Sequence, residues 1–384
     1  MRDNRIEYLD SLRGLAAISV VLSHFVLAYG LDTKSKLLNF SPFHIFYDGF
    51  AAVTFFFVLS GYVLTLSLKN KNELVLGSFY LKRIFRIMPA YIFTLIISFG
   101  FYYFYKTIHT NPDSSSWINS FWGKPLDFTN FVKQLIFILP SNGFAELVCQ
   151  NWSLKVEMQF SFLIPFLYLT YRYTNFFFFF ILNLIFFFLF SFPIYLFNFS
   201  LGIILAMNQD YILETFIELK KKYNIILFCI AILMYTYRYT IPWYYYYFLR
   251  ERSTILSNND LTWFITGVGS FLILLQSFTT PLLQKILKLN FFKFIGRISY
   301  SIYLTHLIVI IFIVPIIVRG LNFLGFTNYY LILFLSLLFL LIITISLSYF
   351  VNLFIEIPAH KFGNNFIRKY LKYWGKLSVD TNKN

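Results

Sequence analysis

The sequence predicts an all-α fold, a polytopic membrane bundle of about ten transmembrane helices. The first observation is composition: the 384 residues are 58% hydrophobic and only 13% charged, whereas about a quarter of the residues in soluble domains are charged. The second is the recurrence of apolar runs close to the roughly 20 residues that cross a bilayer. The run after Arg13 has no small-residue cleavage site behind it, so we expect a retained first span rather than a signal peptide.

The expected spans are residues 9–30, 49–68, 87–105, 152–170, 175–192, 194–208, 224–240, 261–279, 298–318 and 329–352. Pro193 separates the fifth run from the sixth, and the Phe repeat at 176–180 is expected to be lipid-facing filler. We expect one membrane domain over 6–358 and a short basic cytoplasmic tail over 359–384. The long loop over 106–151 is polar enough to form a small cap outside the membrane.

Lys and Arg residues are distributed unevenly between the predicted loops. With the N-terminus in the cytoplasm, the inside segments are 1–13, 69–86, 171–174, 209–223, 280–297 and 353–384. These segments hold 22 of the 32 Lys and Arg residues. Because positive residues gather in cytoplasmic loops, the pattern predicts a multi-pass membrane protein with both termini cytoplasmic. The Phe-, Lys- and Asn-rich composition suggests a bacterial origin, so the expected location is the bacterial cytoplasmic (inner) membrane.

The net charge of +15 follows the loops, so it indicates topology and contact with anionic membrane lipid rather than binding to nucleic acid. The two cysteines, Cys149 and Cys229, form neither a disulfide framework nor a metal motif. The five histidines show no paired ligand spacing either. The sequence therefore predicts no metal site.

Three ionisable residues interrupt the first span. Arg13 and His24 are eleven residues apart, which places them on one helix face about 16 Å apart along the axis, and Asp10 lies close to the same face. Asp10 and Arg13 have the spacing of an i,i+3 ion pair. A histidine this deep in a span is a functional candidate, and a neutral imidazole can take a proton from a hydroxyl. His24 is therefore the predicted catalytic base.

The segment YLKRIFRIMPAY places Arg83 and Arg86 three residues apart, just before the predicted third span. On charge alone, anchoring at the cytoplasmic surface is the simpler interpretation. The alternative is a phosphate clamp, because the planar guanidinium donates two parallel hydrogen bonds.

Polar side chains also open the fourth span and line the ninth. In NWSLKVE, Trp152 and Ser153 precede Glu157, a carboxylate that requires a partner or a raised pKa inside a span. In GRISYSIYLTH, Tyr300, Tyr303 and His306 share a broad sector, where interhelical hydrogen bonding is the simpler interpretation. At the exit of the tenth span, IEIP places a proline that is expected to end the helix.

Six segments of the sequence, taken together and in chain order, resemble the acyltransferase-3 family of membrane acyltransferases. They are LDSLRGLAAISVVLSH, FFFVLSGY, RIFR, WSLKVE, GRISYSIYLTH and IEIP, which run from residue 9 to 358. The resemblance implies a ten-span bundle that moves an acyl group, often acetyl, from cytoplasmic acyl-CoA to a hydroxyl of a cell-envelope or surface glycan. The expected donor is acetyl-CoA, with no metal.

The same resemblance implies site roles. Arg13 and His24 match an essential pair of the family, Arg83 and Arg86 match its Arg-x-x-Arg pair, and Trp152 to Glu157 match its Trp-Ser-Leu-x-Val-Glu element. We expect His24, Glu157 and Asp10 in catalysis and Arg13, Arg83 and Arg86 at the donor. Trp152, Ser153, Tyr300, Tyr303 and His306 are expected to support the substrate or the structure.

Two questions stay open at this point. Some members of the family carry a hydrolase-like domain after the bundle, and this sequence has none after Pro358. Either the bundle acylates the glycan or lipid-linked sugar itself, or a separate periplasmic or extracellular transferase completes the reaction. The alternative function is a transporter or flippase for an anionic or lipid-linked sugar, although no repeated half with matched polar residues supports it.

Overall fold

The computed structural model describes residues 7–29, 41–69, 76–105, 115–121, 128–136, 147–189, 193–217, 221–249 and 254–381. Every regular element in these ranges is helical, which confirms the all-α prediction. Most of the loop that was expected to form an outer cap, and the last three residues of the tail, lie outside the described residues.

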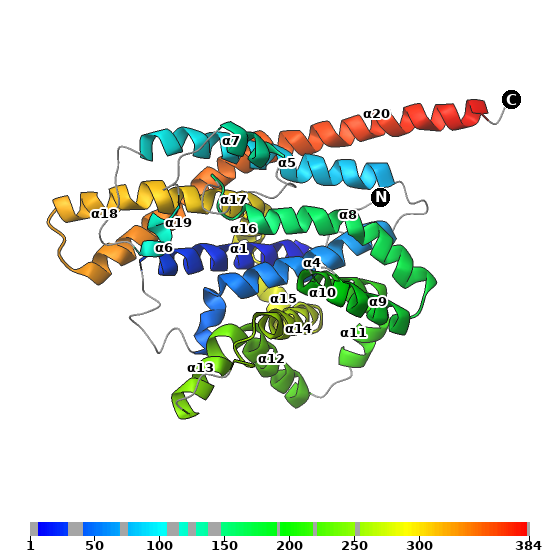
Figure 1. Cartoon of the computed structure of the whole chain (residues 1–384), viewed down its shortest axis with the longest axis horizontal. Coiled ribbons are helices and arrows are strands. Elements are labelled where there is room, and N and C mark those ends of the chain that lie inside the picture. Colours follow the sequence, from blue (N-terminus) through cyan, green and yellow to red (C-terminus); the bar gives the residue numbers. More distant parts are fainter. Residues whose placement is uncertain are drawn as a thin grey trace. The chain divides into compact units, whose positions relative to one another are not determined.

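The helices of the first half are α1 (Glu7–Ala28), the 3₁₀ turn η1 (Pro42–Phe46), α4 (Gly49–Lys69), α5 (Leu76–Tyr105), α6 (Ser116–Asn119), α7 (Phe128–Leu135), α8 (Asn151–Tyr173), α9 (Phe176–Leu189) and α10 (Pro193–Met207). Those of the second half are α11 (Gln209–Ile217), α12 (Lys221–Tyr235), α13 (Tyr237–Leu249), α14 (Asn259–Thr279), α15 (Pro281–Leu287), α16 (Asn290–Arg297), α17 (Ser299–Ile308), the π turn η3 (Val309–Ile313), α18 (Val314–Phe323), α19 (Tyr329–Val351), the π turn η4 (Asn352–Glu356) and α20 (Ile357–Thr381). Figure 1 labels these elements along the chain.

Within the described residues, six helical runs are long and apolar enough to cross a membrane. They correspond to the first, second, third, eighth, ninth and tenth expected spans. The fifth, sixth and seventh fall on α9, α10 and α12, which have only 14 or 15 residues each. The fourth falls on α8, which has 23 residues but a more polar composition. Six spans are therefore supported by length and composition, and the expected ten are not confirmed.

The chain folds into two compact units. Unit 1 comprises residues 1–71, 112–118 and 163–303, and unit 2 comprises residues 72–111, 119–162 and 304–384. Helices α8 and α17 each contribute residues to both units.

In unit 1, α4 and α10 pack very closely, because each helix has a glycine that faces the backbone of the other. A Cβ atom on Gly61 would overlap the carbonyl oxygen of Phe199, and one on Gly202 would overlap the carbonyl oxygen of Val58. This explains Ser60-Gly61 in the second span, where small residues let helices approach closely. The neighbouring α14 also packs on both helices.

Gly202→Ala is expected to lower the free energy of unfolding by about 3 kcal/mol, because the added methyl group meets backbone that cannot rotate away. Thermal unfolding in detergent measures the loss. Gly100→Ala on α5 is the matched control, since a Cβ atom there meets nothing within 4 Å. Equal melting temperatures for the two variants would contradict the tight α4–α10 contact.

In unit 2, two prolines follow π turns within continuous helical runs. Pro315 follows η3 and Pro358 follows η4. Proline lacks an N–H group and its ring clashes with the carbonyl of residue i−4, and a π turn relaxes the backbone at that point. The expectation that the helix ends before Pro358 is therefore wrong, because α20 continues to Thr381.

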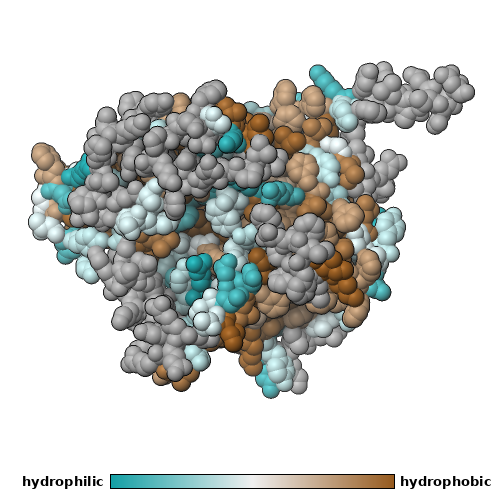
Figure 2. All heavy atoms as spheres, in the orientation of Figure 1, coloured by the Kyte–Doolittle hydropathy of each residue, from teal (hydrophilic) through white to brown (hydrophobic). Residues whose placement is uncertain are grey.

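The surface of the described residues carries many large apolar side chains. Examples are Phe177 at 69% exposed and Ile342 at 60%. Figure 2 shows such hydrophobic residues in brown between hydrophilic ones in teal on one face. Because water would penalise exposed apolar surface of this extent, these side chains are suited to contact lipid.

Candidate active site

The N-terminal half of α1 holds an ion pair. Arg13 Nη1 donates to Asp10 Oδ1 at 2.8 Å, which confirms the i,i+3 pairing expected from the sequence. Both side chains are largely buried, at 16% and 11% exposed. Asp10 is further enclosed where α1 meets α16, since a Cβ atom on Gly296 would overlap the Asp10 carbonyl oxygen. Asp10 therefore holds Arg13 in place.

His24 lies near the opposite end of the same helix and is half-buried. Its imidazole stacks on the indole of Trp117, with ring centroids 5.4 Å apart and an interplanar angle of 24°. Trp117 belongs to the short helix α6, which is tied to α1 by a hydrogen bond from the Ser115 N–H to the Ala28 carbonyl, 2.7 Å long. The aromatic contact fixes the plane of the imidazole, as a positioned proton acceptor requires.

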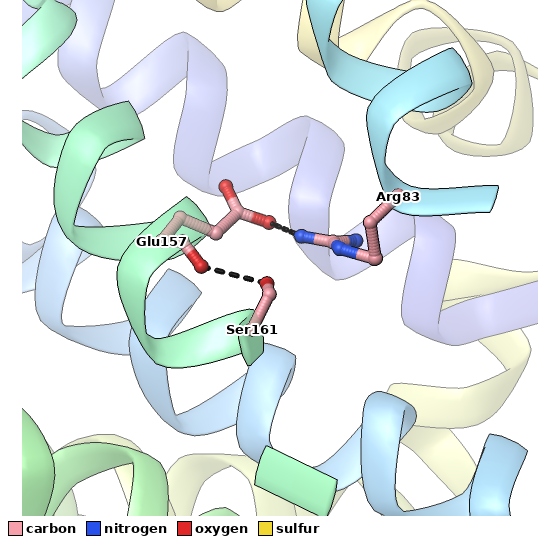
Figure 3. Close-up of polar contacts among 3 residues, drawn as sticks. All are labelled: Arg83, Glu157 and Ser161. Carbon is pink, nitrogen blue, oxygen red and sulfur yellow. Dashed lines mark hydrogen bonds and ion pairs between the residues drawn. The ribbon is translucent and has the colours of Figure 1, made fainter. Parts of the chain in front are cut away.

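In unit 2, Arg83 and Glu157 form a second ion pair. Arg83 Nη2 donates to Glu157 Oε1 at 2.6 Å, and the two side chains are 9% and 24% exposed. Figure 3 shows Arg83 reaching from α5 toward Glu157 on α8, where Ser161 Oγ also donates to the Glu157 carbonyl oxygen. Glu157 thus has the partner that a carboxylate inside a span requires.

This pair corrects the expected position of the arginines. Helix α5 begins at Leu76 rather than at residue 87, so Arg83 and Arg86 lie inside the helix and not before it. Arg83 is about 10 Å along the helix from Leu76, and Glu157 is about 9 Å from the start of α8. Two residues that were expected at opposite membrane surfaces therefore meet within the helices. Arg86 is half-buried on the same helix.

The start of α8 is held by buried polar groups of unit 2. The Tyr91 hydroxyl donates to the Gln134 carbonyl at 2.8 Å, and the Gln150 side-chain amide donates to the Leu304 carbonyl at 2.7 Å. Ser153 is buried and its hydroxyl donates to the Gln150 carbonyl at 3.1 Å, whereas Trp152 is exposed. Ser153 therefore has a structural contact, and Trp152 faces outward from the helix.

The predicted residues of the ninth span lie on α17. Tyr303 is buried and its ring packs edge-on against Phe56, 6.0 Å between centroids, while Tyr300 is half-buried. His306 is completely buried, next to Thr305, which shares a hydrogen bond of 3.0 Å with Ser348 on α19. These contacts agree with the simpler interpretation of this motif, in which polar side chains link helices.

Sequence reasoning missed Trp117 and Asp48. Trp117 lies on the short helix α6, in a stretch of ordinary composition, and only its contact with His24 reveals it. Asp48 precedes α4 and caps it, with Oδ1 accepting from the Ala51 N–H at 2.8 Å. The carboxyl is fully buried, and Oδ2 has no hydrogen-bond partner among the described residues. An acidic residue directly before an apolar run is the cap signal that could have identified Asp48.

Burial raises the pKa of Asp48 to about 7, although the cap hydrogen bond and the charge of Arg238 act in the opposite direction. Because the folded pKa exceeds the unfolded value of 3.8, the folded protein binds the proton more tightly. The ionisation of Asp48 therefore lowers the free energy of unfolding as pH rises from 3.8 to about 7.

Asp48→Asn keeps a capping oxygen but cannot ionise. We expect the variant to match the parent near pH 4 and to be more stable at pH 8 by roughly 1–3 kcal/mol. Thermal unfolding at the two pH values measures the difference. Asp260→Asn, an exposed acid in the first turn of α14, is the control. A variant less stable than the parent at pH 8 would contradict the prediction.

The fold and these residues define a polytopic membrane protein with ionisable side chains inside its helical units. The chain belongs to the acyltransferase-3 family: the family model, described as an acyltransferase domain, matches residues 6–356. Family membership gives no support to the alternative of a transporter or flippase.

One curated relative is the peptidoglycan O-acetyltransferase OatA of Listeria monocytogenes serovar 1/2a (strain ATCC BAA-679 / EGD-e). It is 28% identical over 173 residues, which cover 42% of this chain and 24% of the relative. The chain thus matches about a quarter of that protein's length. No solved structure matches the chain.

Proposed function

We propose that the protein transfers an acetyl group from acetyl-CoA to a hydroxyl of a cell-envelope glycan. The observation that carries the proposal is the half-buried imidazole of His24, which stacks on Trp117. His24 lies on α1, the helix that also carries the Asp10–Arg13 pair. The relative described above, which is a peptidoglycan O-acetyltransferase, supports both the acetyl group and a glycan acceptor.

In the proposed reaction, His24 removes the proton of the acceptor hydroxyl as its oxygen attacks the thioester carbonyl carbon. An ester bond forms, the carbon–sulfur bond breaks, and the proton returns to the leaving thiolate to give free CoA. Arg13 and Arg86 are cations suited to the phosphates of the donor, because guanidinium groups bind phosphate through paired hydrogen bonds. Arg83 of unit 2, which Glu157 orients, has the same guanidinium chemistry and is a further candidate to bind donor phosphate.

The proposed location is a bacterial cytoplasmic membrane, with both termini and the donor in the cytoplasm. The excess of Lys and Arg in alternate loops supports this orientation. The glycan would approach from the opposite side, near the His24 end of α1. Whether the bundle acylates the glycan directly or through a separate extracytoplasmic transferase depends on what the purified protein does alone.

The test is turnover by purified protein in nanodiscs, supplied with radiolabelled acetyl-CoA and soluble glycan fragments. We expect release of CoA thiol that depends on the glycan, with the label recovered as a base-labile ester on the sugar. Label that stays on the protein would indicate a separate transferase. Absence of thiol release with every acceptor tested would contradict the proposed function.

A further inference from the structure

The N-terminal turns of α1 pack directly on α15 and α16 within unit 1 (Figure 1). The Ser11 hydroxyl donates to the Leu287 carbonyl at 2.7 Å. A Cβ atom on Gly296 would overlap the Asp10 carbonyl oxygen, and one on Gly14 would lie 2.7 Å from the Gly296 nitrogen. The backbone of α1 between residues 10 and 14 is therefore in contact with the end of α15 and the end of α16.

The segment that makes these contacts, residues 285–297, is strongly basic, and we call it the basic corner. It contains no Asp or Glu, and its four cations are Lys285, Lys288, Lys293 and Arg297. Lys293 is half-buried and the other three are exposed. Because Arg297 directly follows Gly296, its side chain leaves the backbone next to α1. A group of cations without acids of its own attracts anionic ligands.

Arg13 adds a further cation to the basic corner from α1. Its bond to Asp10 keeps the guanidinium beside the crossing of the two helices, because the Asp10 backbone is what Gly296 touches. Gly14 also touches Gly296, so the Cα atoms of Arg13 and Arg297 are at most about 12 Å apart. Two long side chains that start this close together can contact neighbouring phosphates of one ligand.

We infer that Arg297 binds a phosphate of the CoA donor together with Arg13, which rests on the proposed function. Phosphate oxygens require N–H donors and positive charge, and the guanidinium fork supplies both. CoA carries a pyrophosphate and a ribose 3′-phosphate at the end opposite to its thioester. The basic corner likewise lies at the end of α1 opposite to His24. An anionic lipid headgroup or free phosphate has the same chemistry, and the experiment separates these sources.

The experiment measures equilibrium binding of CoA, 3′-dephospho-CoA and pantetheine to the full chain in phosphatidylcholine nanodiscs, without an acceptor. Dephospho-CoA keeps only the pyrophosphate, and pantetheine has no phosphate. We expect the parent protein to bind CoA most tightly and pantetheine least. Arg297→Gln is expected to lose about tenfold in CoA affinity, whereas its pantetheine affinity changes less than about twofold.

Two further variants make the result specific. Arg172→Gln removes another exposed arginine of unit 1, at the end of α8, and is expected to leave the affinity for all three ligands unchanged. Arg297→Lys keeps the charge but loses the paired donors, so its CoA affinity should fall between those of the parent and Arg297→Gln. Added salt should weaken CoA binding more steeply in the parent than in Arg297→Gln, because salt screens exposed charges.

Three results would overturn the inference. They are unchanged CoA affinity in Arg297→Gln, an equal loss of CoA and pantetheine affinity in that variant, and equal affinity of the parent for CoA and pantetheine. If inorganic phosphate displaced CoA as well as unlabelled CoA does, the basic corner would be an unselective anion site. If Arg297→Gln kept its CoA affinity but lost retention of phosphatidylglycerol in mixed-lipid nanodiscs, Arg297 would bind lipid.

Failure of the inference is distinguishable from failure of the proposed function. Turnover of acetyl-CoA by the parent, with normal CoA binding in Arg297→Gln, would contradict the inference alone. CoA binding that depends on Arg297 without any turnover would support the inference and contradict the proposed acetyl transfer. A parent protein that binds no CoA would contradict both.

Discussion

His24→Ala is expected to reduce acetyl transfer by about 10²–10⁴-fold while the protein still inserts and folds. A positioned general base contributes a rate factor of that size, and the helix that carries His24 is buried mainly through other side chains, such as Val20, Val21 and Phe25. Thiol release from acetyl-CoA in nanodiscs measures the rate. Size-exclusion chromatography and thermal unfolding report whether the variant is intact.

The matched control is His360→Ala, which removes a half-buried histidine of α20 in unit 2. We expect this variant to keep the parent rate. If His24→Ala kept more than a tenth of the parent rate, His24 would not be the base. The stacking of Trp117 on His24 would then have no catalytic significance.

Breaking the Arg83–Glu157 pair is expected to produce the largest loss of stability. Glu157→Gln leaves Arg83 without its counter-charge in a nearly buried position, and such losses cost about 3–5 kcal/mol. Thermal unfolding measures this change in the single variant. Lys82→Gln, which removes the exposed cation next to Arg83, is the control and should change stability little.

The double variant Arg83→Met with Glu157→Leu separates structure from function. Replacing both members of a buried ion pair with apolar side chains is often neutral for stability. We therefore expect the melting temperature to recover while acetyl transfer stays impaired. Full recovery of both would show that the pair serves folding alone and would exclude Arg83 as a ligand of the donor phosphates.

The sequence predicted helices and long spans well, because apolar runs of sufficient length have few other structures available to them. Four of the ten expected spans are not confirmed. The runs on α9, α10 and α12 form helices of 14 or 15 residues, and α8 is long but more polar. The start of α5 was placed too late because YLKRIFR is amphipathic rather than apolar, yet it forms continuous helix.

The candidate site was predictable in part. The Asp10–Arg13 pair depends on local helix spacing, so the sequence alone contained it. The Arg83–Glu157 pair joins residues 74 positions apart, and the stacking of Trp117 on His24 brings the short helix α6 onto α1. Both depend on tertiary packing, which no local pattern encodes.

The π turn at residues 352–356 determines in which direction around the helix axis each side chain of the following helix α20 points. A π turn accommodates one residue more than an α turn, and one residue corresponds to about 100° of rotation. In the observed phase, Gly363 faces Phe85 of α5, where a Cβ atom would lie 2.6 Å from the Phe85 side chain. Deleting one residue from the turn would direct a different face of α20 toward α5, with every later residue still helical.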